Sequence, residues 1–221
     1  MSRSPASLPG EPARDCKLCP RLVAFRAENA RAEPGWHNAP VPSFGPVDAR
    51  VLIVGLAPGR RGANATGRPF TGDWAGELLY PTLLKFGFAR GTYGARADDG
   101  LTLTDARITN AVRCVPPANK PTGAEAAACG EFLVREIAAM KRLACIITLG
   151  NVAHASALKV LGIRRKDAPF GHGTEFQAPD GRHVIASYHC SRLNTNTGRL
   201  TTEMFERVFA RARAIADGTQ P

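Results

Sequence analysis

The chain has 221 residues, of which 44% are hydrophobic and 22% charged, a composition typical of one globular domain with a continuous core. No apolar run approaches the roughly 20 residues that a membrane-spanning helix requires, so no such helix is expected. The formal net charge is +10, and arginine supplies all but six of the 29 basic residues. Arginine suits phosphate groups, so a nucleic acid is the expected partner, although a GC-rich genome produces the same bias.

The first 15 residues, MSRSPASLPGEPARD, lack the apolar centre of a signal peptide. We expect them to be a disordered lead-in, with residues 16–217 forming a single domain in the cytoplasm of a prokaryotic cell. A helix is predicted over residues 20–31. The stretch EPGWHNAPVPSFGP after it is rich in proline and glycine, which excludes regular structure before the first strand.

Strand-like and helix-like segments alternate along the rest of the chain. Short apolar runs with many β-branched residues predict buried strands at residues 50–56, 106–112, 144–150 and 182–188. Helices are predicted at residues 74–86, 122–142, 151–161 and 197–216. The alternation indicates an α/β fold, a three-layer α/β/α sandwich with a central, mostly parallel four-stranded sheet.

Ligands of open α/β sheets bind beyond the carboxyl ends of the strands, and polar segments follow each predicted strand. The first of these, GLAPGRRGANATGRPFTGD, is neither a P-loop nor a dinucleotide fingerprint, so a nucleotide cofactor is not indicated. Its glycines let the backbone approach a ligand closely. Phe70 within it offers a flat face to a base or, alternatively, pins the loop onto the core.

The cysteines of a cytoplasmic protein stay reduced, so metal binding or catalysis must be considered for them. Six occur, at Cys16, Cys19, Cys114, Cys129, Cys145 and Cys190. The first two form C-x2-C and the next two C-x14-C. Zinc favours two tight C-x2-C pairs, so the wide second pair favours a [4Fe–4S] cluster on four thiolates. The alternative is that the second pair consists of ordinary buried thiols. The fifth cysteine lies in an apolar strand and is expected in the core, and the sixth is left for the active site.

Several motifs in this order resemble the uracil-DNA glycosylase superfamily. They are the run GLAPGRRGANATGRPFTGD, the strand end TNAVRC, the segment HCSRLNTNTGRLT and the first four cysteines. The chain is most similar to the iron–sulfur members, and among them to the family 5 (type B) enzymes, over residues 16–203. Related family 4 enzymes have an acidic residue in GEAPG. Here the position is Leu56, which cannot orient or deprotonate water, a lack that family 5 shares.

The resemblance implies a monofunctional DNA glycosylase that starts base excision repair. Such an enzyme flips a deaminated base out of DNA, hydrolyses its N-glycosidic bond and leaves an abasic site. Uracil is the expected base, with hypoxanthine and other damaged bases beside it. The resemblance also implies a [4Fe–4S] cluster with a structural or DNA-docking role. We expect a monomer that binds DNA and no membrane, and that is associated with the nucleoid when bound.

The resemblance assigns roles to side chains at the strand ends. Phe70 would stack on the flipped base, and Asn110 would hydrogen-bond its edge. His189 would donate a hydrogen bond to uracil O2 as negative charge builds there. Asn110 and His189 each have a structural alternative. Asn110 could cap the end of its strand, and the ring of His189 could be hydrogen-bonded within the fold. Asp73 is the candidate for positioning water, and is equally suited to cap a helix before Trp74.

Two further groups of residues complete the predicted site. The base pocket would also include Gly55, Ala57, Pro58, Gly59 and Asn64, with backbone amides of residues 57–59 as donors. The segment from Ser191 to Asn194 would bind DNA. Leu193 or Arg192 would fill the gap left by the flipped nucleotide, and Asn194 would brace the loop. The wider superfamily has His-Pro-Ser-Pro here, and Cys190 and Arg192 stand at the proline positions, so a less rigid loop is expected.

Two other classes of protein remain open at this point. A non-catalytic or base-trapping DNA-damage binding protein with an iron–sulfur cluster would bind the same DNA and leave no abasic site. Leu56 is compatible with this alternative because its side chain cannot handle water. An iron–sulfur electron carrier would ignore DNA, and the net charge of +10 together with the glycine-rich loop argues against it.

Overall fold

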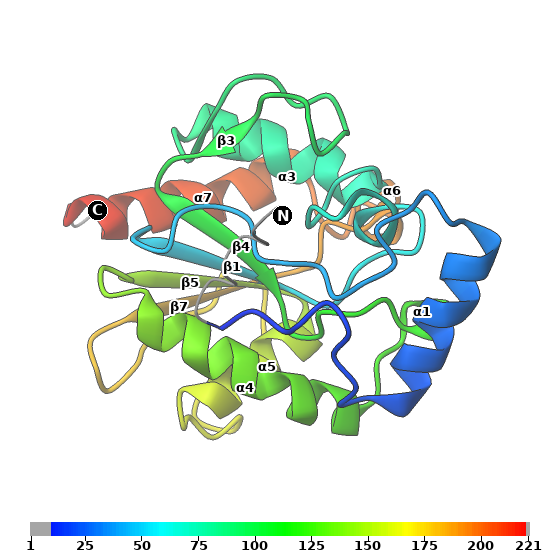
Figure 1. Cartoon of the computed structure of the whole chain (residues 1–221). Helices are drawn as coiled ribbons and strands as arrows, with labels where there is room; N and C mark the ends of the chain where they lie inside the picture. The colour runs from blue at the N-terminus through cyan, green and yellow to red at the C-terminus, as the bar shows by residue number, and fades with distance from the viewer. Residues whose placement is uncertain (1–9, 220–221) are drawn as a thin grey trace.

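The centre of the molecule is a sheet with the strand order β4-β1-β5-β7-β6 (Figure 1). The structure is a computed structural model that describes residues 10–219. Within these residues the sheet has five strands, β1 (Val51–Gly55), β4 (Ala106–Asn110), β5 (Cys145–Leu149), β6 (Glu175–Gln177) and β7 (His183–Ser187). Four of them are parallel, and β6 runs antiparallel to β7 at the edge.

The four parallel strands are the four that the apolar runs predict. All five residues of β1, β4 and β5 are buried, as expected for strands covered on both faces. The edge strand β6 is an addition to the predicted sheet. Its three residues are too few and too polar to give an apolar pattern. Tertiary contacts hold it instead, because the Glu175 carboxylate accepts hydrogen bonds from Arg211 Nε and His183 Nδ1, each at 2.7 Å.

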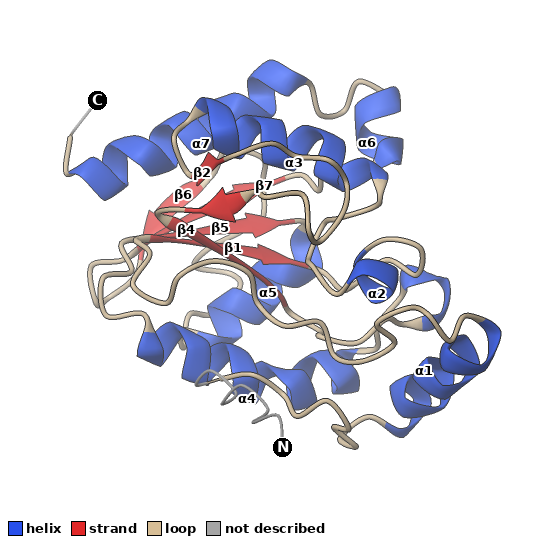
Figure 2. Cartoon of the chain, turned by 45° about the horizontal axis from the view of Figure 1, so that its top comes forward, coloured by secondary structure: helices blue, strands red, loops and turns tan. Residues whose placement is uncertain are grey.

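The helices form two layers, one on each face of the sheet (Figure 2). Along β1, Val51 and Ile53 pack into one apolar core, and Leu52 and Val54 pack into the other, because successive side chains of a strand point to opposite faces. The first face is covered by α3 (Trp74–Lys85) and α7 (Thr202–Asp217), and the second by α4 (Gly123–Ala139) and α5 (Asn151–Val160). The predicted three-layer α/β/α sandwich is confirmed.

Most helix boundaries follow local signals. The helix predicted at residues 20–31 is α1 (Pro20–Ala32), and α4 begins after Thr122, which forms a capping box with Glu125. The prediction of one helix over residues 197–216 is wrong at its start, because α6 (Arg192–Asn196) ends before Gly198 and α7 begins after it. Gly198 has φ +71°, a left-handed conformation that ends helices. None of the helices in residues 10–219 is both long and apolar enough to cross a membrane.

Several short elements lie in the connections. The glycine-rich loop after β1 contains α2 (Ala63–Thr66), and a small hairpin of β2 (Ala89–Arg90) and β3 (Thr102–Leu103) follows α3. A single 3-10 turn, Pro117–Asn119, precedes α4. Elements of two to four residues carry no periodic pattern, so the sequence does not predict them.

The N-terminal segment joins the core earlier than expected. Residues 1–9 of the expected lead-in lie outside the described residues, whereas Glu11 has a fixed place. Its carboxylate accepts hydrogen bonds from Arg107 Nη2 at 3.1 Å and Arg113 Nη1 at 2.9 Å. Both arginines are 1% exposed, and both also bond Glu136. Two buried guanidinium groups need two carboxylates, and the N-terminal segment supplies the second one.

Candidate active site

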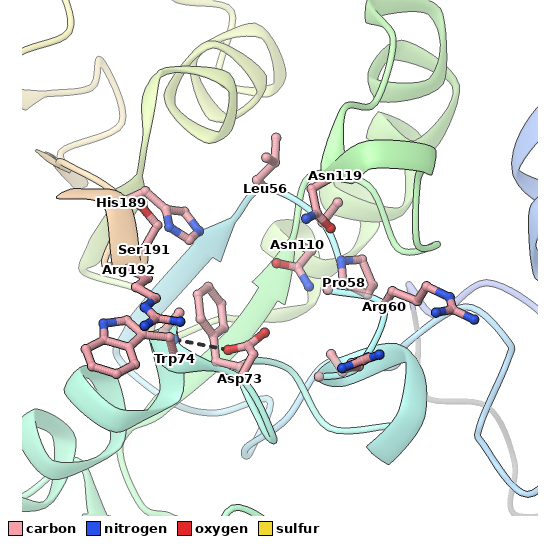
Figure 3. A pocket seen from close by; sticks show the side chains of 17 residues that line it. Leu56, Pro58, Arg60, Asp73, Trp74, Asn110, Asn119, His189, Ser191 and Arg192 are labelled. Carbon is pink, nitrogen blue, oxygen red and sulfur yellow. Dashed lines mark hydrogen bonds between the residues drawn. The ribbon is translucent and has the colours of Figure 1, made fainter. Parts of the chain in front are cut away.

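A cavity of about 630 Å³ opens at the carboxyl ends of the parallel strands (Figure 3). It is lined by the loop of residues 56–63 after β1 and by Phe70, Asp73, Trp74, Ala75, Asn110, Asn119, His189, Ser191 and Arg192. These residues come from segments far apart in the chain, and the parallel topology brings them together. The cavity therefore lies where the general rule for open α/β sheets places a ligand. We call it the strand-end cavity.

One wall of the strand-end cavity depends on the absence of a side chain. Gly55 ends β1 and pairs in register with Asn110 at the end of β4. A Cβ atom on Gly55 would collide with Asn110 Oδ1 and with the ring of Phe70. Phe70 itself has φ +53°, an unusual conformation for a residue with a bulky side chain. The chain thus holds this ring and this amide together over the end of β1.

The amide of Asn110 is buried but not satisfied. The residue is 4% exposed, and its Oδ1 atom has no hydrogen-bond partner among residues 10–219. An unpaired buried polar atom costs about 1–3 kcal/mol, so such atoms are rare in folded proteins. A strand-end cap would use this oxygen within the fold, so the structure does not support the capping alternative. Asn110 also lines the strand-end cavity, so its side-chain amide can contact a ligand there.

His189 faces the same space from the end of β7. Its ring lies nearly parallel to that of Phe70, with centroids 5.9 Å apart and an interplanar angle of 28°. Its main chain is fixed, because Asn194 Nδ2 donates to His189 O at 2.8 Å, which is the predicted bracing contact. Within the described residues no group hydrogen-bonds either ring nitrogen. Burial lowers the pKa of His189 to about 4, so at neutral pH the imidazole is uncharged and carries one N–H donor.

Asp73 fulfils the capping role and still reaches the cavity. Its Oδ1 atom accepts a hydrogen bond from Ala75 N at 3.2 Å, which caps α3 (dashed line in Figure 3). Its Oδ2 atom lies against the glycine-rich loop, where a Cβ on Gly59 would be only 3.0 Å away. Burial raises the pKa of this carboxyl group. Asp73 is the only carboxylate among the described residues that line the cavity, whereas Leu56 contributes an apolar side chain.

The segment after His189 is a short helix rather than an open loop. Ser191 caps α6 by accepting a hydrogen bond from Asn194 N at 3.5 Å. On the outer face of α6, the side chain of Leu193 is 72% exposed. The guanidinium carbon of Arg192 lies 5.4 Å from the ring centroid of Trp74 (Figure 3). An exposed leucine beside an arginine is thus presented next to the mouth of the strand-end cavity.

The first four cysteines come together in a second, small apolar pocket. Cys16 and Cys19 lie just before α1, and Cys114 and Cys129 are brought from the segment after β4 and from α4. Apolar side chains such as Leu22 complete the lining. We call this the thiol pocket. Burial raises the pKa of Cys114 to about 12 and that of Cys129 to about 11.

Two groups beside the thiol pocket act against the effect of burial and favour negative charge on the sulfur atoms. The main-chain N–H of Arg113 donates to Cys129 Sγ at 3.3 Å. Arg26 is 6% exposed, its Nη2 donates to Cys16 O at 2.6 Å, and its Nη1 is buried without a partner in the described chain. No three His, Cys, Asp or Glu side chains within residues 10–219 are placed to hold one metal ion. Four thiols around a pocket beside an unpaired cationic nitrogen fit a cluster, which spreads its ligands more widely than one ion does.

Comparison with known proteins identifies the family. The model of the "Uracil DNA glycosylase superfamily" matches residues 42–213. The chain belongs to this superfamily. It is 46% identical over 207 residues to the type-5 uracil-DNA glycosylase of Thermus thermophilus, covering 91% of this chain and 94% of that protein.

Two further relatives place this glycosylase within the superfamily. It is 42% identical over 206 residues to the type-5 uracil-DNA glycosylase of Pyrobaculum aerophilum, covering 91% of this chain and 89% of that protein. The type-4 uracil-DNA glycosylase of the same organism is 37% identical over 152 residues, covering 68% of this chain and 63% of that protein. The predicted likeness to family 5 is therefore confirmed.

The structure of the glycosylase separates the predicted site residues into groups. Leu56, Ala57, Pro58, Gly59, Phe70, Asp73, Asn110, His189, Ser191 and Arg192 line the strand-end cavity. Asn64 does not, because it is fully buried and its Nδ2 donates to Asn38 Oδ1 at 3.0 Å, so it supports the loop from below. Cys145 is in the core as predicted. The placement of Cys190 in the active site is wrong, because it is fully buried in the core and does not line the cavity.

Among the lining residues that sequence reasoning missed, four have large side chains, Arg60, Arg61, Trp74 and Asn119. The two arginines belong to the glycine-rich run after β1, and their positive charge could have marked them as candidate site residues. Trp74 directly follows Asp73 and is 46% exposed, although its neighbours in α3 are buried. Asn119 lies in the 3-10 turn with φ +55°, a conformation that asparagine tolerates and the sequence alone does not reveal.

Proposed function

We propose that this glycosylase excises uracil from DNA, as the names of its type-5 relatives say of them, and leaves an abasic site. The observation that carries the proposal is the unpaired amide of Asn110 beneath the strand-end cavity. An amide is both acceptor and donor, which matches the N3–H and O4 groups on the edge of uracil. Phe70 lies beside it and provides a flat apolar face for the base. A base inside a duplex cannot reach this site, so the nucleotide must be flipped out.

His189 is suited to stabilise the departing base. Cleavage of the N-glycosidic bond leaves negative charge on the base, and part of it develops at O2. A neutral imidazole with its ring nitrogens unengaged by residues 10–219 donates one N–H to this oxygen without first having to release a partner. Because its pKa is about 4, the donor stays neutral across the physiological range. Removal of one such donor costs about 2.7–4 kcal/mol of barrier, or 10²–10³-fold in rate.

Asp73 is the group we assign to the attacking water. The residue at the position of the family 4 acid is Leu56, which has no polar atom for this task. Asp73 Oδ1 is engaged by the helix cap, which fixes the carboxylate, and Oδ2 remains for a water molecule in the cavity. A fixed carboxylate orients the water and accepts its proton as the sugar becomes electron-deficient. The positive charge that develops on the sugar is stabilised by the same carboxylate.

The site supports a base range wider than uracil. Hypoxanthine presents N1–H and O6 in the same donor and acceptor order that uracil presents at N3–H and O4, so Asn110 reads both edges alike. Selectivity then rests on stacking against Phe70 and on the stability of the leaving base. We therefore include hypoxanthine and other deaminated bases with good leaving ability as substrates.

Contacts to DNA come from the basic surface and from α6. Arg60 and Arg61 line the cavity, and their positive charge supports contacts to the phosphates of the flipped nucleotide. Leu193, 72% exposed on α6, is the side chain we assign to the gap that the flipped nucleotide leaves in the duplex. Ser191 and Asn194 hold α6 in place for this insertion, through the cap and through the bond to His189 O.

We further propose that Cys16, Cys19, Cys114 and Cys129 hold a [4Fe–4S] cluster. When bound, such a cluster joins the segment before α1 to the segment after β4 and supplies structural support. The soft thiol donors, the apolar pocket and the N–H donor to Cys129 Sγ support this assignment. The unpaired Nη1 of Arg26 supports it as well, because a buried cation is stabilised by the negative charge of a tetrathiolate cluster. Purified protein should then be brown and contain about four iron atoms per chain.

One assay tests the proposed activity. Oligonucleotides that contain a single uracil or hypoxanthine are incubated with the chain, and abasic sites are detected as alkali-sensitive breaks. We expect His189→Ala to bind the uracil-containing DNA and to cleave it about 10²–10³-fold more slowly in single turnovers. The matched control is His183→Ala, a histidine at the other end of β7 that bonds Glu175 outside the cavity. DNA binding by the wild-type chain with no abasic sites would indicate a damage-binding protein instead.

A further inference from the structure

Trp74 is an exposed aromatic residue at the rim of the strand-end cavity, next to the capping residue Asp73. Its side chain is 46% exposed and belongs to the cavity lining. The indole takes no part in the core under α3, whose buried residues lie on the other side of that helix. Its exposed ring thus offers a flat apolar surface at the mouth of the cavity.

The indole is held in one orientation. Its Nε1 donates to Thr195 Oγ1 at 2.9 Å, which ties the ring edge to α6. The guanidinium carbon of Arg192 lies 5.4 Å from the ring centroid, so a planar cation occupies one face of the ring. A side chain that is already fixed at its edge loses little conformational freedom when a flat ligand stacks on it.

The flat groups that DNA brings to this rim are its bases. When a nucleotide is flipped into the cavity, the base next to it loses a stacking neighbour, and one of its faces is left bare. Trp74 lines the cavity and is hydrogen-bonded to Thr195 of α6, so it lies at the rim where DNA would meet the protein. Guanidinium groups bind phosphate strongly, so the DNA backbone would compete with the indole for Arg192.

We propose that Trp74 is a stacking platform for the base adjacent to the flipped nucleotide, and that Arg192 leaves the indole face for a phosphate when DNA binds. This inference rests on the proposed base-flipping function. In a duplex, Leu193 fills the gap and the complementary strand keeps the neighbouring base stacked. In single-stranded DNA there is no complementary strand, so Trp74 carries a larger share of the binding there.

The substitutions separate stacking from a purely structural role. Trp74→Ala should weaken binding of single-stranded uracil-containing DNA by about 5- to 150-fold, the range for loss of one aromatic–base stack. This loss should raise KM more than it lowers kcat. Trp74→Phe keeps a ring and loses the bond to Thr195, and should bind within about threefold of the wild type. Thr195→Val removes only the hydrogen bond. If Trp74→Phe and Thr195→Val both match Trp74→Ala, the indole merely supports α6 and the proposal is wrong.

Fluorescence provides a direct readout of the stack. The chain has two tryptophans, so Trp36→Phe leaves Trp74 as the single indole emitter. We expect its emission to be quenched on titration with a single-stranded oligonucleotide that carries an uncleavable tetrahydrofuran abasic analogue. Unchanged emission at saturating DNA would overturn the proposal. Loss of the proposed function is distinguished from this outcome, because it would appear as absence of excision by the wild-type chain.

Discussion

Replacement of Asn110 by leucine should make the protein more stable and less active at once. The wild-type chain keeps Asn110 Oδ1 buried without a hydrogen-bond partner among residues 10–219, at a cost of about 1–3 kcal/mol. Leucine is similar in size and has no polar atom, so Asn110→Leu relieves this cost. For a chain of this length, each kcal/mol corresponds to a rise of about 2–4 °C in the melting temperature. The base edge then meets no polar partner, so excision should fall by about 5- to 150-fold.

Calorimetry and single-turnover excision of uracil measure the two effects on the same preparation. The matched control is Asn29→Leu. Asn29 is equally buried, at 2% exposed, but is satisfied by Phe25 O at 2.8 Å and by Arg60 Nε at 2.6 Å. The control should lower the free energy of unfolding by about 1–3 kcal/mol. If Asn110→Leu lowers the melting temperature as Asn29→Leu does, the amide is satisfied within the free protein, and the reasoning about its ligand is refuted.

Three further predictions concern other parts of the molecule. The pKa of His189 is about 4 in the folded state, below the value of about 6.5 in an unfolded chain. Between these two pH values the unfolded state binds more protons than the folded state. The free energy of unfolding should therefore fall as the pH drops from 7 to 4. His189→Gln should lose less stability over that interval in urea titrations, and an identical pH dependence would contradict the lowered pKa. Cys114→Ser should lose bound iron, whereas Cys145→Ser, in the core of β5, should retain it in iron analysis; equal iron content in the two variants would exclude Cys114 as a ligand. Glu11→Gln should lower the free energy of unfolding by about 1.5–3 kcal/mol, since its carboxylate bonds two buried arginines, and an unchanged urea midpoint would show that these bonds contribute nothing.

The sequence predicted the layers of the fold because buried parallel strands and amphipathic helices have strong periodic patterns. The predicted parallel sheet in turn gave the position of the strand-end cavity, because the polar segments after parallel strands meet at one edge of the sheet. The edge strand β6 escaped prediction because Glu175, paired with Arg211, holds it rather than an apolar pattern. Residues 10–15 were assigned to a lead-in because no local signal shows that Glu11 balances charges on a distant strand.

Within the site, the sequence predicted those roles that depend on neighbouring residues in the chain and missed those that depend on tertiary contacts. The cap by Asp73 follows from its place before α3, and the structure bears it out. Asn64 stands in the same loop as the cavity residues, and only the three-dimensional fold shows that it turns inward to Asn38. The lack of a partner for Asn110 Oδ1 likewise cannot be read from local sequence, because it depends on what surrounds the end of β4. Trp74 was missed because exposure cannot be read from residue type.

The stretch from Asn110 to Cys114 is continuous with β4 and spans both pockets. Between them stands Arg113, whose guanidinium is clamped by Glu11 and Glu136 and whose main-chain N–H meets Cys129. The same five residues thus contribute to both pockets, Asn110 to the strand-end cavity and Cys114 to the thiol pocket. A shift of this short stretch would therefore alter both linings at once.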